Sequence, residues 1–561
     1  MYSQSGAPRL NAADLPEDIL RCIFDYFVGH PNHPVGPRCD DDFRTLQTLR
    51  SVCRSFCNVA SPLLIPTLRA SISPESLRRI EHVTKSPLIA AGIRTIQIST
   101  AYRPKELAED VKAYTDLQRK ALRSLERACD WYTEFMDEIP KDERNGDEDE
   151  ILKAMHIYFE MDWAWRAWAQ NEDGDPPSDN RDRHIALLSE SFDEYRRLQR
   201  EQERLLMDGT FVATLAACIS RLPSLRRVCF LDQADVNPDD FSQRDNLTVL
   251  ANDHAKFRQL LVAPHTWAAL EDLDHPPDIP AVKLLWQLPM AMHANGTPVP
   301  AISISRMPIL SNFNYLCATS NDSDGWSALT AAFSTVESIH LSAGNHVVIR
   351  KEHMSPEAQS HFAGYLSALL SSPLLQSIHI DLYSLQINTG NPIAHRDGLN
   401  TQMFNPIGPA FAKLRSPDLR ELILNGASLT QDELERCFRG VGTKLQRIHV
   451  SAAGVSGGGG WAHALDILRG KVTDSSSSSK KCSVYFSRLC GGGFEKLKAP
   501  PRQRGTEQEE RLAYALSWGE PQGPAEKQEE RDLWAAAGRY VAGEEEVNPL
   551  VGLEVGGKRE V

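Results

Sequence analysis

Residues 362–380, FAGYLSALLSSPLLQSIHI, contain the unit that decides the fold. The stretch begins as an apolar helical segment, and the Ser-Ser-Pro sequence at 371–373 is a turn that ends it. Apolar residues then occupy the first, fourth and sixth positions of a short segment, at Leu375, Ile378 and Ile380. The alternation of its last residues is typical of a strand with one buried face. The pattern therefore predicts a helix, a turn and a short strand.

The same apolar spacing occurs at five further places along the chain. They are Ile93-Ile96-Ile98, Leu225-Val228-Phe230, Val336-Ile339-Leu341, Leu419-Leu422-Leu424 and Leu445-Ile448-Val450. Repetition of helix, turn and strand is typical of leucine-rich repeats, whose stacking makes one continuous core. The units start at uneven intervals, whereas regular arrays repeat every 20–29 residues or so. We therefore expect an α/β fold with an irregular repeat solenoid over 208–455 and a first repeat-like unit at 69–104.

Residues 105–207 indicate a helical insertion in this array. Helical stretches are expected at 105–137, 150–171 and 181–207, joined by acidic loops that contain Gly and Pro. Trp165 and Trp168 are three residues apart and share a helix face, whereas Trp163 is turned away. We expect these tryptophans to pack helix against helix, and an aromatic patch for a partner is the alternative.

Residues 456–561 are expected to form a low-complexity, acidic and largely disordered tail. Gly-rich, Ser-rich and charged runs dominate the composition of this segment. Two islands differ from it, because 482–489 resembles a strand and 529–541 an amphipathic helix.

Charge and composition exclude several classes of protein. The 561 residues carry a net charge of −14, which makes nucleic acid a poor candidate partner. No apolar run reaches the roughly 18 residues of a membrane helix, and the N-terminus shows no secretory signal. Eleven cysteines are too few and too scattered for a disulfide scaffold. We expect a reduced, intracellular protein of the cytoplasm or nucleus, with no membrane and no nucleic acid among its partners.

The N-terminal segment predicts a small helical module at 12–68. Leu15-Pro16 begins a helix with an apolar stripe that reaches Phe27. A second stripe from Leu46 to Ala60 reads as one helix, capped by Thr45 and closed by a proline. A third short apolar segment follows. Such a module has too small a core to be very stable alone, so it is expected to dock against a partner.

These residues carry a family resemblance. The segments LPEDILRCIFDYF (15–27) and TLQTLRSVCRSFCNVASPLL (45–64) resemble the F-box, although the loop between them is longer than is usual there. The remainder is similar to fungal F-box proteins with irregular leucine-rich repeats. The resemblance implies a three-helix F-box that binds a Skp-type linker and, through it, a cullin and a RING protein.

The function implied is that of a substrate-recognition adaptor in an SCF-type cullin–RING ubiquitin ligase, which itself catalyses nothing. The resemblance assigns linker docking to ten residues, some of which must also form the module's own core. These are Leu15, Pro16, Ile19, Leu20, Ile23, Leu46, Leu49, Val52, Cys53 and Phe56. The alternative is a repeat-containing interaction scaffold that is not coupled to ubiquitination.

A second candidate site lies on the strands of the repeats. Strand alternation directs the position between the apolar residues away from the core, towards the open surface. That position and its exposed neighbours carry polar and charged side chains, which we hypothesise to bind an unidentified protein substrate. They are His340, His379, Asp381, Arg420, Glu421, Arg447 and His449. The alternative is that they are ordinary solvated strand residues.

No motif supports catalysis, a cofactor or a metal. Residues 454–458 match G-x-S-x-G, but no acidic residue lies between Ser456 and the single downstream histidine, His463. His30, His33 and Cys39 have near-ligand spacing, but a structural zinc site would need more thiolates. No dense arginine cluster stands out along the chain, so the sequence indicates no pocket for a phosphate group.

Overall fold

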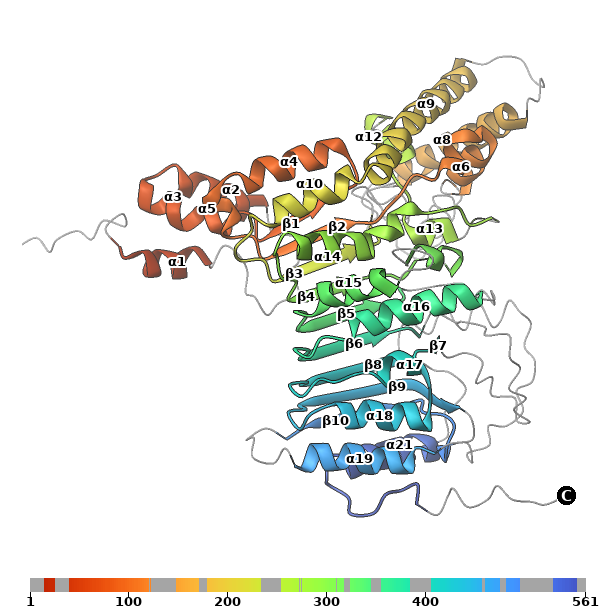
Figure 1. Ribbon diagram of the computed structural model, residues 1–561. Coiled ribbons are helices and arrows are strands. Elements are labelled where there is room, and N and C mark those ends of the chain that lie inside the picture. Colours follow the sequence, from red (N-terminus) through yellow and green to blue (C-terminus); the bar gives the residue numbers. More distant parts are fainter. Residues whose placement is uncertain are drawn as a thin grey trace, which may run out of the picture.

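The computed structural model describes most of the chain and shows a mixed α/β protein (Figure 1). The described residues are 15–25, 40–120, 122, 148–170, 179–233, 254–271, 273, 275–308, 310–316, 323–344, 355–383, 405–456, 460–474, 481–494 and 528–551.

The N-terminal module consists of short helices around a core of its own. Its elements are α1 (Glu17–Asp25), α2 (Asp40–Arg50), α3 (Arg54–Ala60) and the 3-10 turn η3 (Ser61–Leu63). The core joins Leu20 and Phe24 of α1 to residues of the other helices, and the rings of Phe24 and Phe56 meet edge to face. This cluster is separate from the main core, so the module is a distinct packing unit.

The second helix predicted for this module is wrong in its bounds. The chain leaves the helix after Arg50 and starts a new one at Arg54, with a turn closed by the hydrogen bond from the Ser51 amide to the Thr48 carbonyl. Thr45 therefore lies inside α2 and does not cap it. The turn keeps Leu46 and Phe56 in the same core, which explains why the apolar stripe looked continuous.

One parallel sheet runs through the rest of the molecule. Its strands follow the order β1-β2-β3-β4-β5-β6-β8-β9-β10, and β7 pairs with β8 at the side. Their bounds are Thr67–Ala70, Thr95–Ser99, Arg227–Leu231, Ala301–Ile304, Ser338–Ser342, Ser377–Asp381, Asn405–Pro406, Glu421–Thr430, Arg447–Ser456 and Ser483–Ser487 for β1 to β10. All six predicted apolar motifs lie at these strands, and each unit buries its alternate residues in one core.

Among the residues that the structure describes, helices cover one face of this sheet and none lies over the other (Figure 1). Thr430 and Glu433 form a reciprocal capping box at the start of α18. The helices and 3-10 turns of this part of the chain are α4 (Pro74–Thr84), α5 (Pro87–Ala90), α10 (Thr210–Ile219), α13 (Trp267–Glu271), η5 (Pro280–Lys283), α14 (Leu284–Ala294), η6 (Leu310–Leu316), α15 (Ser323–Phe333), α16 (Pro356–Leu369), α17 (Gly408–Phe411), α18 (Gln431–Gly440), α19 (Ala462–Thr473) and α21 (Gln528–Val541).

The expected insertion forms a helical arm beside the first strands (Figure 1). It contains α6 (Lys105–Glu109), α8 (Glu148–Gln170) and α9 (Asp179–Met207), with α12 (His254–Leu261) packed against it. The long helix expected from residue 105 is wrong at its start, because Asp110 breaks it and caps the next helix by accepting the amide of Lys112 at 2.8 Å. Much of the remainder of that prediction lies outside the described residues. Trp165 is buried and donates its indole N–H to the His184 carbonyl, as helix-to-helix packing requires.

The boundary predicted at residue 456, between the solenoid and a largely disordered tail, is wrong. The segment beyond it adds α19, the strand β10 and α21 to the same stack, and β10 pairs in register with β9. Trp534 of α21 is buried and donates its indole N–H to the Leu489 carbonyl. The Gly- and Ser-rich runs lie between these elements, and the prediction of a disordered tail relied too heavily on the composition of those runs. The rest of the predicted tail, 457–459, 475–480, 495–527 and 552–561, lies outside the described residues.

Candidate functional site

The N-terminal module presents apolar side chains that its own core does not use. Ile19 and Ile23 lie one turn apart on α1, and 48% and 46% of their surfaces are exposed. Val52, in the turn between α2 and α3, exposes 57%. Leu20 and Phe24 alternate with the two isoleucines along α1 and point into the module core. The helix therefore has two apolar faces, of which one is covered.

The ten residues assigned to linker docking separate into three groups. Leu20, Leu46 and Phe56 are buried in the module core, where they hold the helices together. The half-buried group packs at the edge of that core and comprises Leu15, Leu49 and Cys53. The exposed group, which a partner can reach, comprises Pro16, Ile19, Ile23 and Val52.

A second surface runs along the helix-free face of the sheet. The parallel register aligns the central residue of each strand into one continuous row across the sheet. From β1 to β10 this central row is Arg69, Gln97, Cys229, Ser303, His340, His379, Ile423, His449 and Tyr485. The rings of His449 and Tyr485 meet edge to face with centroids 4.7 Å apart. Five of its nine residues, from His340 on β5 to Tyr485 on β10, thus form a strip of aromatic and apolar side chains.

Charged and amide groups flank the central row on both sides. Towards the ends of the strands, the Asn425 amide donates to the Asp381 carboxylate at 3.0 Å. Towards their starts, the Glu421 carboxylate accepts from the Ser377 hydroxyl and pairs with Arg447 at 3.3 Å. The carbonyl oxygen of the Asn425 side chain is buried and accepts no hydrogen bond from the described residues. Such a buried acceptor is expensive to leave unpaired.

The register thus brings together the predicted substrate residues. His340, His379 and His449 lie in the central row, and Asp381, Glu421 and Arg447 lie in the flanking rows. Arg420 is exposed immediately before β8, where its amide donates to the Gln376 carbonyl. Sequence reasoning missed Tyr485 as a member of the row because it had assigned this segment to the tail. The strand-like alternation at 482–489 was the signal that could have found it.

The pKa values of the three histidines are all lowered, which favours their neutral form. Burial lowers the pKa of His340, and the charge that His379 can carry lowers it further. Burial also lowers the pKa of His379, against the opposing effect of Asp381, and that of His449. Neutral imidazoles offer a partner an aromatic face together with one hydrogen-bond donor and one acceptor.

The residues weighed for catalysis and metals form no site among those described. Residues 454–456 belong to strand β9, and His463 binds the Glu435 carboxylate at 2.8 Å. Nowhere in the described ranges do three or more His, Cys, Asp or Glu residues gather as metal ligands. His30, His33 and Cys39 lie outside the described residues. Among the helices that the structure describes, none combines the length and apolar character needed to cross a membrane.

Comparison with known proteins adds no assignment, since no family model and no curated protein matches the sequence.

Proposed function

We propose that the chain is the substrate-recognition adaptor of an SCF-type cullin–RING ubiquitin ligase. In this role the N-terminal module docks to a Skp-type linker, the strand face binds a protein substrate, and the chain performs no chemistry itself. The observation that carries the proposal is the uncovered face of α1, where Ile19 and Ile23 stay exposed in the segment that resembles an F-box.

Burial of this face on a partner would stabilise a complex. Covering the exposed half of an aliphatic side chain contributes about 1 kcal/mol at the usual value per unit of apolar area. Three such side chains, with Pro16 beside them, suit the apolar centre of a protein interface. The module's core keeps the helices in place while this face is shared with the linker.

The central row of the sheet is the proposed substrate surface. Its middle and far strands carry His340, His379, Ile423, His449 and Tyr485, with the unpaired Asn425 carbonyl beside them. Aromatic side chains that also hydrogen-bond are suited to protein recognition. Figure 1 places α1 at one end of the sheet and β8 to β10 at the other. A linker on the module would thus leave these strands open to a substrate.

Co-purification with a Skp-type linker tests the proposal. The double variant Ile19→Asp with Ile23→Asp places charge on the exposed face of α1 and spares the residues of the module core. We expect it to lose the linker, whereas Leu374→Asp, an exposed apolar residue before β6, should retain it. Equal recovery of the linker by both variants would refute docking through α1.

The alternative scaffold function rests on the strand face alone. It would be favoured if the wild-type chain bound a partner through the central row but never co-purified with the linker. Charge introduced at Ile19 and Ile23 would then have no effect on any partner.

A further inference from the structure

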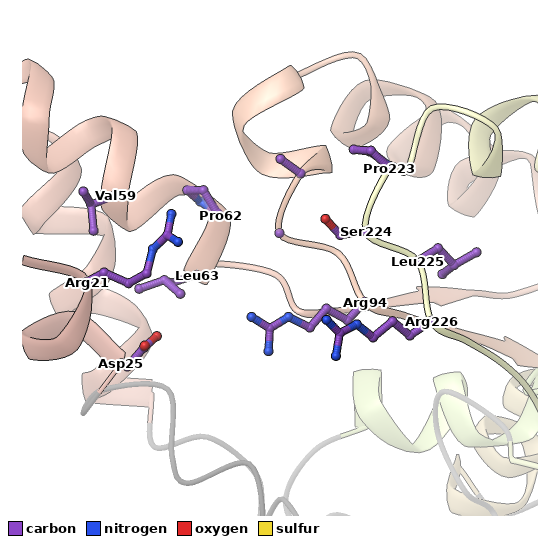
Figure 2. A pocket seen from close by; sticks show the side chains of 12 residues that line it. Arg21, Asp25, Val59, Pro62, Leu63, Arg94, Pro223, Ser224, Leu225 and Arg226 are labelled. Carbon is purple, nitrogen blue, oxygen red and sulfur yellow. The ribbon is translucent and has the colours of Figure 1, made fainter. Parts of the chain in front are cut away.

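A cavity of about 510 Å³ lies between the N-terminal module and the first helix–strand units (Figure 2). Its volume is within the range of small-molecule sites, about 300–1,000 Å³. One wall comes from α1 and η3, and the other from the turns that precede β2 and β3. The cavity therefore joins two parts of the chain that have separate cores.

Two arginines stand next to each other on the wall formed by the repeats. Arg94 and Arg226 immediately precede β2 and β3, and the Arg226 amide donates to the Arg94 carbonyl at 2.8 Å. Figure 2 shows both side chains extending from this wall towards the module. Like charges at facing positions of neighbouring strands destabilise a sheet. Neither arginine forms an ion pair with a carboxylate of the described residues, so their repulsion is not compensated by an acidic neighbour.

The module supplies a third arginine from the opposite wall. Arg21 of α1 lines the cavity together with Asp25, one turn further along the helix. The rest of the lining is apolar apart from the Ser224 hydroxyl, and includes Leu63 and Leu225. Three guanidinium groups from distant parts of the sequence thus surround one small cavity.

This arrangement matches an anion with two charged groups. A guanidinium binds a phosphate oxygen pair with two parallel hydrogen bonds, which makes arginine the preferred residue for phosphate recognition. The pair on one wall suits the more negative end of a ligand, and Arg21 suits a second anionic group across the cavity. The Asp25 carboxylate disfavours negative charge at the end near α1, so the ligand should lie with its main charge on Arg94 and Arg226.

We propose that this cavity binds a small molecule that carries at least two phosphate groups. The ligand would link the module to the repeats, because its charged groups contact residues from both. This site is independent of the proposed adaptor function and requires neither a linker nor a substrate.

Calorimetric titration of the full-length protein with inorganic pyrophosphate tests the proposal. We expect one site per chain, with affinity falling as salt is raised. The double variant Arg94→Gln with Arg226→Gln should bind at least 30-fold more weakly. The control, Arg78→Gln with Arg221→Gln, removes two exposed arginines outside the cavity lining and should change affinity less than twofold. An equal loss in both double variants would show attraction to net charge alone and overturn the proposal.

Single variants, a second anion and a thermal melt test the proposal further. Asp25→Asn should strengthen pyrophosphate binding about threefold, and Arg21→Gln should weaken it at least fivefold. Sulfate should bind at least tenfold more weakly than pyrophosphate, and equal affinity would contradict a diphosphate site. Without ligand, the melting temperature of the Arg94→Gln with Arg226→Gln variant should not fall, because the substitutions remove a repulsion. Absence of any pyrophosphate binding to the wild-type chain would also overturn the proposal.

Discussion

The imidazole rings of His340 and His379 meet edge to face, with centroids 4.3 Å apart and planes inclined by 74°. The two residues are direct partners in the register of β5 and β6, so the sheet itself fixes their contact. Burial lowers the pKa of both rings, which keeps the pair neutral at physiological pH. The pair lies in the central row and gives the proposed substrate surface an uncharged aromatic centre.

The substitution His379→Ala should raise the pKa of His340. It removes the like charge that opposes protonation of His340 and opens that ring to water. Nuclear magnetic resonance titration of the His340 ring nitrogens measures the change. Arg447→Ala is the control and should leave this pKa where it is. A fall or no change in the His379→Ala variant would contradict the described contact.

The variant His379→Ala with Arg420→Ala tests the strand face as a substrate surface. Both side chains lie on or beside the face, and neither belongs to the core. We expect proteins labelled by proximity to the wild-type chain to be lost from the variant, while recovery of the linker is unchanged. An identical set of labelled proteins would remove the central row from the proposal.

Acid should destabilise the chain through His265. This residue is buried beside the helical arm, and burial lowers its pKa from 6.5 to about 3, assisted by Arg103. The unfolded chain therefore takes up a proton below about pH 6.5 that the folded chain refuses until about pH 3, and stability falls with pH across this interval. Between pH 6.5 and 5 the loss should be about 2 kcal/mol.

Thermal melts at several pH values measure this loss. The variant His265→Leu cannot take up the proton, so its midpoint should depend less steeply on pH than that of the wild-type chain. Parallel pH curves for the two proteins would show that His265 does not carry the effect.

The substitution Gly92→Ala should destabilise the packing between the N-terminal module and the first helix–strand unit. A methyl group at Gly92 would overlap the Pro62 carbonyl oxygen of η3, so one of the two backbones must move. Overpacking of this kind costs about 1–3 kcal/mol, and protease cleavage between module and repeats should accelerate. Gly470→Ala is the control, since a methyl group there meets no atom within 4 Å. It should be neutral or slightly stabilising in its helix.

Trp534→Ala tests whether the C-terminal segment belongs to the stack. The indole is buried against the last strand and bonded to the Leu489 carbonyl, so its removal should cost about 3–5 kcal/mol locally. Hydrogen exchange at β10 should then become faster. Unchanged exchange there would support the dispensable tail that the composition suggested.

The sequence allowed the strands to be predicted more reliably than their surroundings. At Ile378 and Ile380 the two-residue period and the preceding turn are local signals, and the alternation also indicated that His379 faces away from the core. The break between α2 and α3 leaves no such signal, since the apolar stripe continues across it. The apolar stripe of a helix also does not show which of Ile19 and Leu20 packs into the core, because both residues are part of that stripe.

The cavity arginines could not have been grouped from the sequence. Arg21, Arg94 and Arg226 are separated by the module, the first unit and the whole helical arm. Only the pairing of β2 with β3 and the packing of η3 beside Gly92 bring them to one place. Such a site depends on tertiary contacts, whereas the central row follows from a repeated local pattern.

Hydrogen–deuterium exchange of the full-length chain, with and without a purified Skp-type linker, tests the central claim most directly. We predict slower exchange in α1 (Glu17–Asp25) and in the turn and helix at 51–60, with β5 to β9 unchanged. The strand face would then remain free for a substrate while the module is bound. Slower exchange in the strands, or unchanged exchange throughout at a saturating linker concentration, would contradict docking of the linker to the N-terminal module.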